Sequence, residues 1–123
     1  MRRRLILPLA LLLMGQGGVP RAHCDFSSAI AGLGEAEHLA ARPIASLADG
    51  RRLGEELATR IEVLPPRFER CGCPRLGELL REAAQTAGPA ASEASAARII
   101  GVLQQVRFRL RLAREALSAQ GCR

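Results

Sequence analysis

The stretch IIGVLQQVRFRLRLAREAL, residues 99–117, carries the clearest structural pattern in the chain. Its apolar residues recur at alternating intervals of four and three: Ile99, Leu103, Val106, Leu110, Ala113 and Leu117. That interval places the side chains on one face of an α-helix, because a helix completes a turn every 3.6 residues. The stretch therefore predicts a long amphipathic helix whose apolar face must be covered by other elements.

Three further segments show helical rather than strand periodicity, over residues 26–41, 46–63 and 74–87. Their apolar stripes consist of Phe26, Ile30, Leu33, Ala36 and Ala40; of Leu53, Leu57, Ile61 and Leu64; and of Leu76, Leu79, Leu80, Ala83 and Ala87. Each stripe is wide enough to pack against neighbouring helices. The chain is therefore predicted to be all-α.

The expected helix starts carry residues that cap helices. Asp25 or Ser27 can cap the first helix, and Ser46 with Asp49 has the spacing of a capping box at the second. Ser92 can cap the last helix. Capping satisfies backbone N–H groups that have no partner inside the helix, so these residues support the predicted boundaries.

The expected helix ends and turns carry proline. Pro43 follows the first helix, and the pair Pro65 and Pro66 is expected to stop the second, because proline lacks the backbone N–H. Pro74 suits the first turn of the third helix. Short connections favour antiparallel neighbours, so residues 23–123 are predicted to form a single up-down-up-down four-helix bundle.

The four cysteines lie between or outside the predicted helices. Cys24 precedes the first helix, Cys71 and Cys73 lie between the second and third, and Cys122 follows the fourth. In an up-down-up-down bundle all four gather at one end. We therefore expect two disulfides, joining one of the central cysteines to Cys24 and the other to Cys122. The sequence leaves both pairings open.

The first 22 residues, MRRRLILPLALLLMGQGGVPRA, have the layout of a secretory signal peptide. Three arginines precede a short apolar segment, residues 5–14, and small residues follow it. A membrane-spanning helix needs about 20 apolar residues, so this segment is too short to span. We expect cleavage of residues 1–22, export to the periplasm or the extracellular space, and no stable membrane anchor afterwards.

Charge excludes some classes of function. The chain has 18 arginines and 12 acidic residues, but four arginines lie within residues 1–22, which leaves a net charge of +2 after cleavage. Residues 25–69 contain more acids than arginines, and residues 70–123 the reverse. A small net charge on an exported chain argues against binding nucleic acid. The uneven distribution favours pairing between the two halves of the bundle.

The most unusual surface feature is the stretch RFRLRLAR, residues 107–114. On a helix, Arg107, Arg111 and Arg114 share one side, while Phe108 and Leu112 form an apolar pair outside the main stripe. One interpretation is a surface that binds a partner protein or an anion. The other is that the arginines pair with the acidic first two helices, and that Phe108 and Leu112 widen the buried face.

Other chemistry is scarce in the sequence. A reduced Cys71 and Cys73, with His23, could hold a soft metal such as copper or zinc, although an oxidising compartment removes the thiolates. No nucleotide-binding loop or haem motif is present, and His23 and His38 stand without other parts of a catalytic triad. No cofactor is expected.

Together these observations predict a small exported helical protein that acts as a non-enzymatic binding or interaction module. Its partner is expected to be a protein or an anionic molecule, which the sequence does not identify. The alternative function is binding or carriage of copper or zinc through the cysteine cluster.

Overall fold

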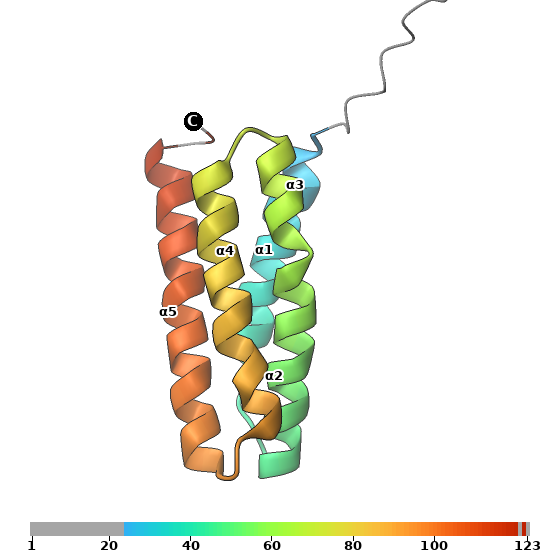
Figure 1. Cartoon of the computed structure of the whole chain (residues 1–123), viewed down its shortest axis with the longest axis vertical. Helices are drawn as coiled ribbons and strands as arrows, with labels where there is room; N and C mark the ends of the chain where they lie inside the picture. The colour runs from blue at the N-terminus through green and yellow to red at the C-terminus, as the bar shows by residue number, and fades with distance from the viewer. Residues whose placement is uncertain (1–23, 121, 123) are drawn as a thin grey trace, which may run out of the picture.

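The chain forms an all-α bundle, as the sequence predicts. The computed structural model describes residues 24–120 and 122, in which the elements are α1 (Phe26–Ala40), α2 (Leu47–Glu62), α3 (Leu64–Arg70), α4 (Pro74–Ala87), the 3-10 helix η1 (Gly88–Ser92) and α5 (Ala96–Gln120). Figure 1 shows α3 continuing the rod of α2, so that the elements make a four-helix bundle with up-down-up-down order. The expected signal peptide, residues 1–22, lies outside the described residues.

Side-chain caps start the first two helices. Asp25 accepts a hydrogen bond from the backbone N–H of Ser28 at 3.0 Å and caps α1. Ser46 Oγ accepts one from the N–H of Asp49 at 3.1 Å. The carboxylate of Asp49 returns to the N–H of Ala45 at 3.0 Å, one residue before the cap. The Ser46 and Asp49 motif therefore satisfies two backbone donors at the start of α2, as a capping box does.

The second helix ends where the sequence predicts, because α2 stops at Glu62 and Val63 is its C-cap. A further helix that was not predicted, α3, begins at once and holds Pro65 and Pro66 in its first turn. Proline is compatible with that turn, because the N–H groups there have no helical partner. The prolines therefore kink the rod and leave α3 to run to Arg70, just before the first central cysteine.

The last helix starts later than predicted. Ser92 ends the 3-10 helix η1, and α5 begins at Ala96, where Ser95 Oγ accepts a hydrogen bond from the N–H of Arg98 at 3.2 Å. The intervening η1 packs on α2, and Ala90 of η1 is fully buried there. Gly54 of α2 makes this approach possible, because a Cβ at Gly54 would collide with the Cβ of Ala90.

The core consists almost entirely of aliphatic side chains along the predicted stripes. The stripes of α2, α4 and α5 are buried as expected, except that Leu117 near the end of α5 is half-buried. In α1 the pattern is shifted: Ala29 is fully buried, whereas Phe26 is 36% exposed and Ile30 half-buried. Phe26 instead contacts the buried ring of Phe68 edge-on, with ring centroids 6.4 Å apart.

Two disulfides join the chain at the end of the bundle that holds both termini of the described residues (Figure 1). The first bridge connects Cys24 to Cys71, and the second connects Cys73 to Cys122. They close loops with sequence separations of 47 and 49 residues. The predicted gathering of all four cysteines is thus confirmed, and the pairing that the sequence left open is resolved.

The bridges also indicate where the protein works. Disulfides persist in oxidising compartments and are rare in the reducing cytosol. Two of them in a small domain indicate an oxidising, exported environment. Within residues 24–120, none of the helices combines the length and the apolar character needed to cross a membrane.

Candidate partner-binding surface

The arginine-rich stretch lies in the second half of α5, and its phenylalanine faces away from the core. Phe108 is 56% exposed. It is two residues from both Val106 and Leu110, which are buried, and therefore lies about 160° around the helix from each of them. The interpretation that Phe108 widens the buried face does not hold in this fold. Leu112, one turn further on, is half-buried.

Two of the three predicted surface arginines bind α1. The Nε of Arg107 donates a hydrogen bond of 2.6 Å to the carbonyl of Ala40, the last residue of α1. The guanidinium of Arg114 pairs with the carboxylate of Glu37, with an Nε to Oε1 distance of 2.9 Å. Both interactions are partly buried. These arginines therefore hold α5 against α1, and the positive end of Arg107 also complements the helix dipole of α1.

The other two arginines of the stretch differ from each other. Arg109 points to the opposite side and pairs with Glu82 of α4 at 2.9 Å. Arg111 is exposed and takes part in no ion pair within the described part of the chain. Of the predicted site residues, Arg111 and Phe108 are thus the two whose functional groups remain turned to solvent.

An unpredicted residue extends this surface. Ile100 is 45% exposed and lies two turns before Phe108. The solvent-facing side of α5 carries only uncharged side chains between Ile100 and Phe108, and it carries Phe108 and Arg111 in its second half. We call this side the outer face of α5, and it comprises Ala97, Ile100, Gly101, Gln104, Phe108, Arg111 and Leu112. The signal for Ile100 is that it lies outside the four-and-three spacing of the main stripe, whereas the adjacent Ile99 lies in it.

The cysteine cluster is structural in this form of the protein. Each of the four sulfurs is bonded to another sulfur, so none offers the thiolate that a copper or zinc site at Cys71 and Cys73 requires. His23, the third expected ligand, lies outside the described residues. Within those residues, no group of three histidine, cysteine or acidic side chains is placed to hold a metal ion.

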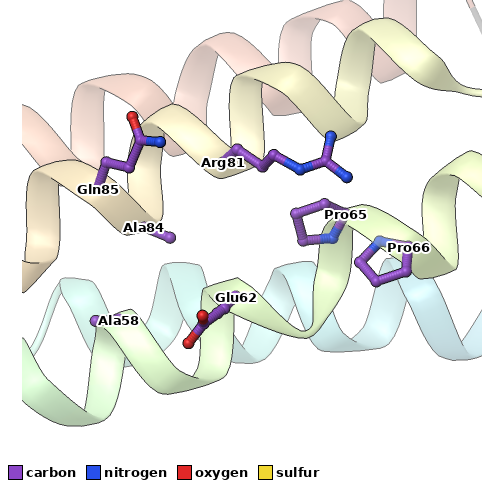
Figure 2. Close-up of a pocket in the computed structure, with 7 residues that line it drawn as sticks. All are labelled: Ala58, Glu62, Pro65, Pro66, Arg81, Ala84 and Gln85. Atoms are coloured by element: carbon purple, nitrogen blue, oxygen red, sulfur yellow. The ribbon is translucent and has the colours of Figure 1, made fainter.

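A groove of about 430 Å³ runs beside the break between α2 and α3, facing α4. Figure 2 shows Ala84 and Pro65 facing the space between the two rods, with Arg81 extending above Pro65 and Glu62 beside Ala58 on the α2 side. The carboxylate of Glu62 and the guanidinium of Arg81 point away from each other, and Arg81 is paired with Glu69. The groove therefore has small apolar walls but no polar groups that converge on one ligand.

The sequence did not predict this groove, because it predicted no helix between the prolines and Cys71. His38 is exposed on α1, and the carboxylate of its neighbour Glu37 forms an ion pair with Arg114. Among the described residues, four large apolar side chains are exposed, and two of them, Ile100 and Phe108, lie on the outer face of α5. No protein-family model, curated protein or solved structure matches this chain.

Proposed function

We propose that this protein is a small exported binding module that presents the outer face of α5 to a partner protein. The observation that supports this proposal best is the 56% exposure of Phe108, on the side of α5 turned away from the core. Burying a phenylalanine contributes roughly 1.5–3 kcal/mol, and this domain has only three phenylalanines with which to stabilise itself. A binding partner that covers Phe108 recovers that contribution, and aromatic residues are enriched at the centres of such interfaces.

The residues beside Phe108 define the chemistry of the partner. Ile100 adds an exposed apolar side chain about two turns before Phe108 and about 80° around the helix from it, and Arg111 adds a positive charge nearby that is unpaired within the described residues. Arginine binds carboxylates with two parallel hydrogen bonds. The matching partner surface is an apolar recess with an acidic group at its rim.

The leader and the bridges together support a proposal for the compartment. Residues 1–22 are proposed to direct export and to be removed, which leaves the bundle free in the periplasm or the extracellular space. The two disulfides suit such a compartment, because they stabilise a domain too small to have a large core.

A capture experiment with matched variants tests this function. The oxidised bundle is immobilised, and proteins of its own compartment are applied to it, to Phe108→Ser and to Arg111→Glu. The controls are Val63→Ser, at an apolar residue 49% exposed on the α2–α3 junction, and Arg52→Glu, at an exposed arginine of α2.

The proposal expects at least one protein that the wild type and both controls retain and that both α5 variants lose. If every retained protein binds all five chains equally, the outer face of α5 is not the binding surface.

A further inference from the structure

Two small residues in the first half of the outer face of α5 correspond in position to two bulky residues in its second half. The small residues are Ala97 and Gly101, beside the larger Ile100, and the bulky residues are Phe108 and Leu112. Gly101 and Phe108 are seven residues apart, which is close to two full turns, so they lie on the same side of the helix. Ala97 and Leu112 lie four residues outside this pair, at either end.

Packing inside the bundle does not explain Gly101. A Cβ at Gly50 or Gly54 would collide with buried neighbours, which accounts for glycine in α2. A Cβ at Gly101 would meet nothing within 4 Å. Glycine in the middle of a helix lowers its stability relative to alanine. Gly101 therefore destabilises α5, and no contact inside the bundle requires it.

We infer that the outer face of α5 binds the same face of a second copy of this chain, with the two helices antiparallel; this inference rests on the proposed function of that face. A two-fold axis between Gly101 and Phe108 exchanges the two positions. Each Phe108 then lies over the Gly101 notch of the other copy, and each Leu112 lies over the other Ala97. In these two pairings a large side chain lies over a small one.

Charge favours the same orientation. In the antiparallel pair, Glu115 lies next to the start of α5 in the other copy, because it is three residues beyond Leu112. Glu115 is exposed and forms no ion pair within the described residues, and the first turn of α5 contains no acidic residue. A carboxylate near the N-terminus of a helix is stabilising. A parallel pair would instead place Phe108 against Phe108.

Analytical ultracentrifugation of the oxidised exported chain tests this inference. The wild type is expected to show a concentration-dependent doubling of mass. Gly101→Phe fills the notch and is expected to weaken self-association by at least about 30-fold, the loss typical of a residue at the centre of an interface. Gly88→Phe is the matched control, because a Cβ at Gly88 also meets nothing within 4 Å and Gly88 lies outside α5.

A size exchange tests the register. Phe108→Ala alone should weaken the dimer, and the double variant Gly101→Phe/Phe108→Ala should restore it, because each new phenylalanine then lies over an alanine. Circular dichroism at 222 nm and intact disulfide masses confirm that each variant is folded before its mass is measured. A dimer that tolerates Gly101→Phe, or one that the double variant fails to restore, overturns the antiparallel pairing.

The result is separable from the proposed function. A chain that remains monomeric up to about 1 mM has no specific self-association, which overturns the inference. If such a monomer still loses a captured protein through Phe108→Ser, the proposed function stands with a different partner. A monomer whose captured proteins ignore the α5 variants contradicts both.

Discussion

The close approach of η1 to α2 predicts that alanine at position 54 destabilises the protein. Gly54 is buried, and its added Cβ would collide with the Cβ of Ala90 and lie 3.4 Å from the carbonyl oxygen of Ala87. Ala90 has no rotamer with which to move away, so η1 itself must shift. Such overpacking costs up to about 3 kcal/mol, whereas replacing a helical glycine by alanine gains about 1 kcal/mol. Gly54→Ala should therefore lose about 2 kcal/mol.

The same substitution at an open position provides the control. Gly101→Ala introduces a Cβ that meets nothing within 4 Å, so only the gain in helix propensity applies, about 1 kcal/mol. Thermal unfolding followed by circular dichroism, at a few micromolar protein with disulfides intact, should lower Tm by roughly 8–16 °C for Gly54→Ala and raise it by roughly 4–8 °C for Gly101→Ala. The double variant Gly54→Ala/Ala90→Gly removes the colliding methyl and should be about 3 kcal/mol more stable than the sum of the single effects. Equal stabilisation by both single alanine variants would refute the close packing of η1 on α2.

Three further predictions concern the ends of α5, its arginines and the bridges. Ser95→Ala should cost about 1 kcal/mol in chemical denaturation because it removes the α5 cap, whereas Ser92→Ala should stay within about 0.5 kcal/mol; the reverse order would place the helix start at Ser92. Arg107→Gln should cost about 1–2 kcal/mol, because a partly buried charged hydrogen bond to α1 is lost, and Arg111→Gln less than about 0.5 kcal/mol; equal effects would contradict the different roles of the two arginines. Replacing both cysteines of either bridge by alanine should lower the free energy of unfolding by about 4 kcal/mol. Limited reduction followed by alkylation and mass spectrometry should open the Cys24–Cys71 bridge before the Cys73–Cys122 bridge, because Cys73 is only 3% exposed. The opposite order of alkylation would show that burial does not control reduction.

The periodic core was predictable because burial in a bundle repeats with the helix. The stripes of α2, α4 and α5 follow from spacing alone. The first turn of α1 was not predictable in this way, because at the end of a bundle fewer neighbours cover each side chain. Phe26 therefore remains 36% exposed and Ala29 takes the buried position. Spacing identifies a face, but the depth of burial depends on what stands opposite.

The boundaries depended on backbone groups that a sequence pattern does not reveal. Pro65 and Pro66 are equally compatible with the end of one helix and with the first turn of the next, and the choice is made by Leu64 and Phe68, which α3 buries in the core. Ser92 and Ser95 are both capable caps. Gly54 decides between them, because it allows η1 to pack on α2 before α5 begins.

The candidate site was predictable in composition and not in detail. The excess of acids in residues 25–69 and of arginines after them correctly anticipated pairing such as that of Arg114 with Glu37. Which arginine remains unpaired within the described residues depends on its position around α5, where Arg111 lies about 40° from Arg107 and about 60° from Arg114. Arg107 and Arg109 flank Phe108 and reach α1 and α4 on either side. Phe108, which lies between them, consequently faces solvent on the side of α5 opposite the core.

The pairing of the cysteines illustrates how helix adjacency supplies what spacing cannot. In the bundle α1 contacts α3 and α5 contacts α4, whereas α1 and α4 lie diagonally opposite. Cys71 ends α3 and Cys73 precedes α4, so each lies near the terminus that its own helix contacts. Gly72 between them has a φ of 79°, a left-handed conformation that favours glycine, and it turns the two neighbouring cysteines toward different partners. The alternative pairing would have to cross the end of the bundle twice, and so the uncrossed pairing follows from the order of the helices around the core.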